Sequence, residues 1–283
     1  MKLDGRRESQ NVDDRRGKGT GKASLGIGGV IIMGLIIWVM GGNPMDFFTQ
    51  QALQGISTES TYTPSAEEEE LATFSKKILA GTEDIWTEIF KQNGLKYESP
   101  HMVLFSGAVQ SGCGNATSST GPFYCSADQT VYIDLSFFKE METRLAAGGD
   151  FAYAYVIAHE VGHHVQYLLG TLDQVHAQQA RSSQTESNRL SVRLELQADF
   201  YAGVWAHYDN QMFASLEDGD IEEGLNAATQ IGDDRLQMES QGYTVPDAFN
   251  HGTSAQRVRW LKKGFQSGDL SQGDTFSVDY NAL

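Results

Sequence analysis

Two histidines four residues apart, inside an apolar stretch, constrain the fold of this chain more than any other feature. They belong to the run His159-Glu160-Val161-Gly162-His163, and apolar residues dominate both of its flanks. In a helix, positions i and i+4 share one face, so both imidazoles can reach a single ion. Glutamate and histidine are seldom buried without a partner, and a metal ion would supply one. We therefore expect a buried helix that presents two metal ligands.

The chemistry of these residues favours zinc. Zn²⁺ suits two neutral imidazole nitrogens, and Glu160 stands where it can take a proton from metal-bound water. The spacing H-E-x-x-H is typical of zinc peptidases. The alternative is an amphipathic helix whose polar face carries His and Glu for solubility alone. The apolar residues at 151–158 argue against that alternative.

A catalytic zinc usually takes three protein ligands and leaves the fourth position to water. The extended pattern H-E-x-x-H-x-x-G-x-x-H is not met, because Gln166 and Leu169 replace its Gly and third His. Glu195 and Asp199 are four residues apart in a second helical stretch and therefore share a face. We predict that Glu195 is the third ligand and that Asp199 accepts the N–H of a liganding histidine. The alternative is a solvent-exposed acidic face paired with Arg193.

An uncharged segment runs from Ala23 to Met45. Its length fits one transmembrane helix, which we place at residues 23–42. Residues 1–22 carry seven basic and four acidic groups, so the positive-inside rule leaves them in the cytoplasm. A cleaved signal peptide is the alternative, but the apolar run is long and no A-x-A site follows it.

The remaining chain divides by composition. Residues 43–64 are polar and are interpreted as a linker, residues 65–268 as one catalytic domain, and residues 269–283 as a polar, peripheral tail. We expect a mainly α fold with a small β-sheet, in the α+β class. The expected strands are residues 102–105 and 131–135. Helices are expected from a capping box at 65–68 with a break near Gly81, over 137–147, from Asp150 through the histidines, over 184–207, from Asp220, and from Ser254 to 265.

The charge and the two cysteines limit the environment. The net charge of −16 argues against nucleic acid as a partner and against a domain that lies on anionic lipid. Cys113 and Cys125 are the only cysteines. They can form a disulfide outside the cytoplasm, and a metal pair is the less favoured alternative because their spacing fits no usual zinc knuckle.

H-E-x-x-H followed by E-x-x-x-D is the gluzincin arrangement, and the chain resembles the bacterial predicted neutral zinc metallopeptidases. Several blocks carry the resemblance in order along most of the chain. They are residues 2–16 (KLDGRRESQNVDDRR), the apolar segment, Cys113-Gly114, residues 121–125 (GPFYC), 131–134 (VYID), 159–166, 195–205 and 251–257 (HGTSAQR).

This resemblance implies one Zn²⁺ per chain held by His159, His163 and Glu195, with Glu160 as general base. In similar enzymes a downstream His, Tyr or Arg stabilises the oxyanion, and His251 is the first candidate for that role, before Arg257 and Tyr208. A histidine that only braces its loop is the alternative. The resemblance also implies a substrate edge near Asn115 and Ala116, although a disulfide-braced turn would explain those residues equally well.

These observations predict a zinc endopeptidase, anchored in the inner membrane of a bacterium, that hydrolyses peptide bonds in the periplasm or outside the cell. Its partners would be a peptide or protein substrate and the lipid bilayer, while its oligomeric state is left open. The alternative function is a catalytically silent protein that keeps the zinc and tethers a partner at the membrane; Glu160 argues against it, since a structural zinc needs no base. Zinc-dependent cleavage of a non-protein amide is a third interpretation.

Overall fold

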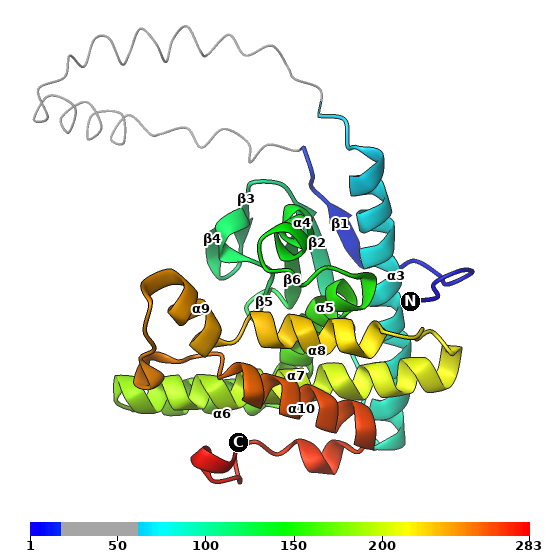
Figure 1. The fold of residues 1–283 in the computed structure, drawn as a ribbon. Helices are drawn as coiled ribbons and strands as arrows, with labels where there is room; N and C mark the ends of the chain where they lie inside the picture. Colours follow the sequence, from blue (N-terminus) through cyan, green and yellow to red (C-terminus); the bar gives the residue numbers. More distant parts are fainter. Residues whose placement is uncertain (18–61) are drawn as a thin grey trace, which may run out of the picture.

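The computed structural model describes residues 1–17 and 62–283 of the chain. The described part is mainly helical with a small mixed sheet, which confirms the expected α+β class (Figure 1). The predicted transmembrane helix at 23–42 and nearly all of the predicted linker lie outside the described residues. Within residues 1–17 and 62–283, no helix combines the length and the apolar character that a membrane crossing requires.

The main sheet has four strands in the order β1-β2-β6-β5. Strands β1 (Val12–Asp14), β2 (His101–Phe105) and β6 (Thr130–Asp134) run parallel to one another, and β5 (Phe123–Cys125) pairs antiparallel with β6. The predicted strands at 102–105 and 131–135 are therefore confirmed. A separate hairpin, which we did not predict, joins β3 (Ala108–Ser111) to β4 (Gly114–Thr117).

The first long helix, α3 (Ala66–Gln92), begins with the predicted capping box. The Ser65 hydroxyl accepts from the Glu68 backbone N–H, and the Glu68 carboxylate accepts from the Ser65 backbone N–H. The helix does not break at Gly81, where we expected an interruption. Another side chain passes close to that glycine, and a Cβ atom there would lie 2.7 Å from a guanidinium nitrogen of Arg6.

The remaining helices pack around the α5–α7 pair. Their bounds are α4 (Ser136–Thr143), α5 (Asp150–Leu168), α6 (Thr171–Gln179), α7 (Gln184–Phe213), α8 (Asp220–Gln230), α9 (Asp233–Gln241) and α10 (Ser254–Ser267). Helix α10 approaches α7 so closely that a side chain would not fit at two glycines of the contact. A Cβ atom at Gly203 would lie 2.2 Å from the carbonyl oxygen of Leu261, and a Cβ atom at Gly264 would lie 2.0 Å from the carbonyl oxygen of Phe200. These glycines allow the backbone of α10 to lie directly against that of α7, and Figure 1 shows where the two helices lie in the fold.

We expected Asp150, Asp220 and Ser254 to cap helices α5, α8 and α10, but in each case the cap is the preceding residue. Asp150 and Asp220 are the first residues of α5 and α8, and Gly149 and Gly219 stand at the caps with positive φ. Helix α10 is capped by Thr253, which forms a capping box with Gln256, instead of by Ser254. In each case the acidic or hydroxyl group still lies in the first turn, where it faces the positive end of the helix dipole.

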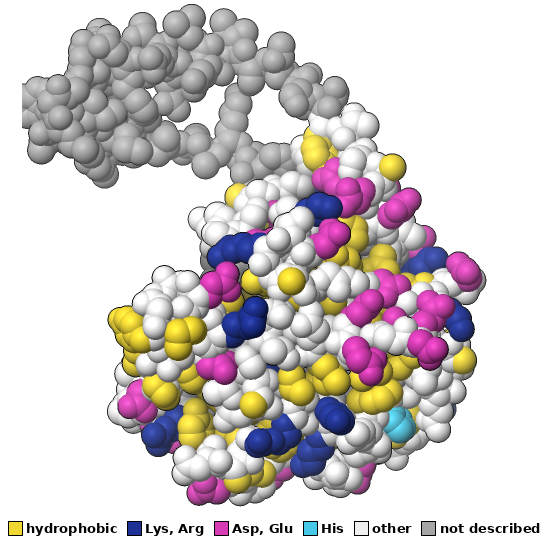
Figure 2. Space-filling model, viewed as in Figure 1, with side chains coloured by type: hydrophobic (Ala, Val, Ile, Leu, Met, Phe, Trp, Pro, Cys, Tyr) yellow, Lys and Arg dark blue, Asp and Glu magenta, His cyan; other side chains and the backbone are white. Residues whose placement is uncertain are grey.

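Helix α9 carries exposed apolar residues, which Figure 2 shows gathered at the left of the molecule. Leu236 and Met238 of α9 are 37% and 52% exposed, and Tyr243 and Val245, in the loop that follows, are 59% and 40% exposed. Isolated exposed apolar residues need no explanation, but a contiguous group often marks a binding surface.

The C-terminal segment, which we expected to be peripheral, and residues 1–17 at the other end both pack on the domain. In the C-terminal segment, Thr275 is fully buried, the Arg193 guanidinium donates to the carbonyls of Thr275 and Val278, and Gln197 donates to Gly273. At the other end, β1 extends the main sheet beside β2. The structure therefore makes residues 1–17 part of the catalytic fold, where composition alone suggested a separate cytoplasmic segment.

Candidate metal centre and catalytic cleft

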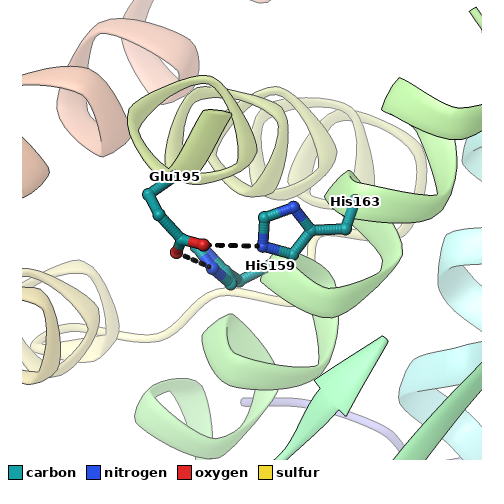
Figure 3. Close-up of side chains that lie close together, drawn as sticks. All are labelled: His159, His163 and Glu195. Atoms are coloured by element: carbon teal, nitrogen blue, oxygen red, sulfur yellow. Dashed lines mark hydrogen bonds and ion pairs between the residues drawn. The ribbon is translucent and has the colours of Figure 1, made fainter. Parts of the chain in front are cut away.

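Helices α5 and α7 bring two imidazoles and one carboxylate to a single point (Figure 3). The Nε2 atom of His159 lies 3.1 Å from one carboxylate oxygen of Glu195, and the Nε2 atom of His163 lies 3.4 Å from the other. One atom from each of the three residues lies within 4.8 Å of the others. The helices can approach this closely because Gly162 faces Ala198, whose backbone oxygen would be 3.0 Å from a Cβ atom at that position.

The other nitrogen of each imidazole has a fixed protein partner. His159 donates from Nδ1 to Asp199 at 2.8 Å, and His163 donates from Nδ1 to the side-chain oxygen of Gln166 at 2.9 Å. The Gln166 amide nitrogen in turn donates to the Leu194 carbonyl on α7. These bonds fix the tautomer of both rings and leave Nε2 to a ligand. The predicted role of Asp199 matches this geometry, whereas Gln166 was noted in the sequence only as a departure from another motif.

Asp199 is fully buried and accepts from three groups. Besides His159, Tyr155 donates from its hydroxyl at 2.6 Å, and the Arg257 guanidinium donates through two nitrogens at 2.8 and 2.9 Å. Arg257 comes from α10 and is itself 3% exposed. The sequence analysis considered Arg257 for oxyanion stabilisation. Its guanidinium is instead committed to Asp199, so it holds the carboxylate that orients His159.

The pKa shifts show how strongly this centre favours positive charge. Burial alone would lower the pKa of the His159 imidazole, but Asp199 and Glu195 outweigh it and raise the pKa to about 10. Burial would raise the pKa of the Asp199 carboxyl, whereas Arg257 and His159 lower it to about 2. Against the same burial effect, the two imidazoles hold the pKa of Glu195 well below its usual range. The two carboxylates therefore stay ionised and can hold a cation between the helices.

The donor set fits zinc. Two imidazole nitrogens and one carboxylate, each supported by a second hydrogen bond or by burial, form the usual protein share of a catalytic zinc site. Among the described residues, Asp150, Asp220 and Glu223 form a second group in which one oxygen atom from each residue lies within 4.8 Å of the others. It contains no imidazole, and two of its carboxylates lie against the amino group of Met1. The histidine-containing group is the better candidate for the metal.

Glu160 and the metal-binding face open onto a cleft of about 600 Å³. Glu160 follows His159 on α5, is 8% exposed, and lines this cleft together with His159, His163 and Glu195. Apolar side chains form much of the rest of the wall. They are Phe137, Val156, Leu172, Leu194, Ile231 and Leu236. The cleft therefore offers a proton acceptor beside the metal-binding residues and room for an apolar ligand group.

His251 also lines the cleft, from the loop that precedes α10. Asp233, the first residue of α9, lies 3.2 Å from its Nδ1 atom and accepts backbone N–H groups from residues 250–252. Burial would lower the pKa of the His251 imidazole, but the hydrogen bond to Asp233 raises it overall. The predicted candidate is therefore present at the cleft, and the sequence analysis missed the aspartate that braces it.

The substrate edge differs from the expectation. Asn115 and Ala116 lie on β4, where they pair with Gln110 and Val109 of the β3–β4 hairpin, and neither lines the cleft. The backbone beside the cleft belongs to residues 120–124, which lead into the edge strand β5. The hairpin satisfies the hydrogen bonds of β4 on one side, while β5 is paired on one side with β6 and ends the sheet.

A disulfide joins Cys113 to Cys125, as the sequence analysis favoured. It ties the turn of the β3–β4 hairpin to the end of β5, and Cys113 itself lines the cleft. In the chain-entropy estimate, closure of a loop of this length stabilises a fold by about 3 kcal/mol. The bond therefore restrains the edge of the sheet next to the metal-binding helices.

An H-E-x-x-H helix that shares a cation site with a glutamate of a second helix, beside an open cleft, defines the class of zinc metallopeptidases. Sequence comparison then gives the family. Residues 1–276 match the family described as "Putative neutral zinc metallopeptidase", and the chain belongs to it.

The chain is similar in sequence to proteins of several bacteria. The chain is 50% identical over 284 residues to "Uncharacterized protein YpfJ" of Escherichia coli strain K12, which covers 98% of this chain and 99% of the relative. It is 47% identical over 192 residues to "Uncharacterized protein Mb2605" of Mycobacterium bovis and to "Uncharacterized protein Rv2575" of Mycobacterium tuberculosis, over 64% of each chain. No solved structure matches the chain.

Proposed function

We propose that this protein is a zinc endopeptidase that hydrolyses peptide bonds within an extended substrate. One observation carries the proposal. The Nε2 atoms of His159 and His163 face the Glu195 carboxylate at the floor of an open cleft, and Glu160 lies beside them. A purely structural zinc site is closed and has no need of an adjacent proton acceptor. Zinc held by these three residues would lower the pKa of its water ligand toward about 7 and would polarise the substrate carbonyl.

The other steps of peptide hydrolysis are assigned to side chains of this protein. Glu160 accepts a proton from the attacking water and later delivers it to the amine that leaves. The imidazolium of His251, held by Asp233, faces the cleft and stabilises the negative charge that develops on the carbonyl oxygen. Asp199 and Gln166 keep both liganding imidazoles in the correct orientation. This assignment gives the three candidate metal ligands, Glu160 and His251 each a defined part in peptide hydrolysis.

The shape of the cleft supports a peptide substrate with apolar side chains. An extended peptide can add to the edge of a sheet, and β5 provides such an edge beside the cleft. The apolar wall of the cleft reaches Leu236 on α9, and the exposed Met238, Tyr243 and Val245 follow nearby in sequence. We therefore expect unfolded or flexible segments rich in apolar residues to be preferred over folded, charged surfaces.

We further propose that the domain acts outside the cytoplasm, attached to the membrane by the apolar run at residues 25–40. The disulfide between Cys113 and Cys125 supports this location, because such bonds persist in oxidising compartments. The acidic character of the chain is consistent with a domain that stays away from anionic lipid.

Turnover of an unfolded protein tests the proposed activity. Purified full-length protein should cleave casein, lose that activity when a chelator removes the metal, and regain it when Zn²⁺ is restored. Glu160→Gln should retain one Zn²⁺ per chain and lose about 10²- to 10⁴-fold in kcat/KM, because the proton acceptor is gone while the ligands remain. Glu222→Gln changes an exposed glutamate of α8 and serves as the matched control. Full casein turnover by the Glu160 variant would remove this residue from the mechanism.

A further inference from the structure

Residues 1–17, which we call the N-terminal arm, are built into the same fold as the catalytic cleft. Strand β1 of the arm pairs with β2 in parallel register, Val12 opposite Met102 and Asp14 opposite Leu104. The Met102 N–H donates to the Asn11 carbonyl, and the Arg15 N–H donates to the Leu104 carbonyl, both at 2.8 Å. The arm therefore supplies one outer strand of the catalytic sheet.

Arg6 anchors the arm between helices α3 and α7. Its guanidinium donates to Asp209 at 2.9 Å and lies 3.7 Å over the ring of Phe213. Asp209 is 1% exposed, so this contact compensates a buried charge. The guanidinium crosses α3 at Gly81, where any Cβ atom would collide with it. The glycine that we expected to break α3 thus provides the space that the arm occupies.

Glu83 of α3 forms a second anchor. It is 6% exposed, and its carboxylate accepts from the Arg7 guanidinium at 2.9 Å, the Ser9 hydroxyl at 2.5 Å and the Asn11 amide at 2.8 Å. All three donors belong to the arm. Without the arm, this carboxylate would lose these three partners, and the edge of β2 would be exposed.

The end of the arm meets the start of the helical domain. The buried Arg16 guanidinium donates to the Glu68 carbonyl and to the Glu69 carboxylate, both at 2.9 Å. Gly17 lies so close to Tyr62 that a side chain at position 17 would overlap the tyrosine ring. Figure 1 shows the arm and the start of α3 at the same end of the molecule. The end of residues 1–17 and the start of residues 62–283 therefore lie next to each other.

We propose that the N-terminal arm and the catalytic domain lie on the same side of the membrane. A strand that completes a sheet cannot be separated from it by a bilayer. This inference revises the sequence-based topology, in which the basic residues 6, 7, 15 and 16 held the N-terminus in the cytoplasm while the domain lay outside. Three of these residues, Arg6, Arg7 and Arg16, bind acids of the domain instead.

Labelling of single cysteines in cells tests the inference on the full-length protein. Asp4→Cys places a thiol on the exposed part of the arm, and Lys91→Cys places one on the exposed surface of α3. Both native cysteines are joined in the disulfide, so each variant presents one new thiol. Spheroplasts are treated with a membrane-impermeant maleimide before and after permeabilisation. We expect both variants to react before permeabilisation, to the same extent.

Each outcome of the labelling decides the question. Reaction of both variants only after permeabilisation would still place the arm and the domain together, and would move the proposed site of action to the cytoplasm. Reaction of Lys91→Cys before and Asp4→Cys only after permeabilisation, or the reverse, would overturn the inference. The casein assay does not enter this readout, so failure of the proposed function and failure of the shared topology are distinguishable.

Thermal unfolding of the detergent-solubilised full-length protein gives an independent measurement of docking. Arg6→Ala should lower Tm by about 5 °C or more, because it leaves Asp209 buried without its guanidinium partner. Arg15→Ala is the matched control, since the Arg15 side chain is exposed and pairs with Asp13 of the arm itself. It should shift Tm by no more than about 1 °C. Equal Tm values for both variants and the parent would show that the arm is not docked.

Discussion

The metal centre and the N-terminal arm both use charged side chains from distant parts of the chain, but they leave them in different states. Where the arm packs on α3, Glu83 of that helix accepts from Arg7, Ser9 and Asn11, so its carboxylate is fully engaged by fixed donors. In the metal centre, Glu195 faces the Nε2 atoms of two imidazoles at an open cleft. Protein donors occupy the carboxylate of Glu83, whereas the carboxylate of Glu195 is available to a ligand.

Asp199 shows the same contrast within a single helix. It lies one turn from Glu195 on α7, yet it accepts from His159, Tyr155 and Arg257 and has no exposed surface. Carboxylates whose oxygens are occupied by protein donors should influence the stability of the fold and the orientation of neighbouring side chains. A carboxylate that faces a cleft together with imidazoles should influence the affinity for zinc directly. The variants below test this division.

Glu195→Ala should have the largest effect on metal binding. Loss of an outer hydrogen-bond partner typically weakens zinc binding about 10- to 100-fold, so loss of a direct ligand should weaken it more than about 100-fold. Competition with a chromogenic chelator measures this affinity. Glu186→Ala, which changes an exposed glutamate of the same helix, should bind zinc like the parent. Unchanged affinity in the Glu195 variant would mean that the third ligand lies elsewhere.

Arg257→Lys should weaken zinc binding by about 10- to 100-fold while the three ligands remain. A lysine cannot reproduce the two-nitrogen contact with Asp199, so His159 would be less firmly oriented. Arg259→Lys, two residues along α10 at an exposed position, is the control. Equal zinc affinity for the two variants would show that Asp199 orients His159 without help from the guanidinium.

Local patterns placed the candidate ligands on shared helix faces because helix periodicity and ligand chemistry are both local. The four-residue spacings of His159 with His163, and of Glu195 with Asp199, fixed which side chains share a face. The apolar flanks then required a partner for the polar groups. The same kind of local rule predicted the capping box at Ser65, which the structure confirms.

The residues that hold the ligands could not be found in this way. Arg257 lies 58 residues from Asp199 in the chain, and an arginine near the start of a helix has no local mark of burial. Gln166 carries a weak signal, because it follows His163 by three residues and so lies on an adjacent part of the same helix. The packing of the arm on the domain could not be predicted for a related reason. Its arginines fit the positive-inside rule, and only the folded chain shows the acids that they bind.

Glu83→Gln should affect stability and spare the metal. The amide keeps the shape of the side chain but loses the charge-assisted bonds to Arg7, so the free energy of unfolding should fall by about 2 kcal/mol. Zinc affinity should stay equal to that of the parent. Denaturant unfolding and chelator competition on the same samples measure the two quantities. Glu88→Gln, also on α3 but with a side chain that is 44% exposed, is the control. A loss of zinc affinity in the Glu83 variant would contradict the distinction between carboxylates that are occupied by protein donors and the carboxylate that faces the cleft.

Asp233→Asn should give the smallest effect, which is a change in pH dependence. The bond to Asp233 raises the pKa of His251, so the imidazolium that stabilises the oxyanion is present below that pKa and is lost as the pH rises through it. Replacement by asparagine removes the negative charge, and the alkaline fall in kcat/KM for casein should move to lower pH. The plateau value should change less than about tenfold, because His251 remains and the amide oxygen can still accept backbone N–H groups. In His251→Asn the alkaline limb that depends on this group should disappear. An alkaline limb that stays in place in both variants would assign the oxyanion contact to another residue and leave His251 as a brace of its loop.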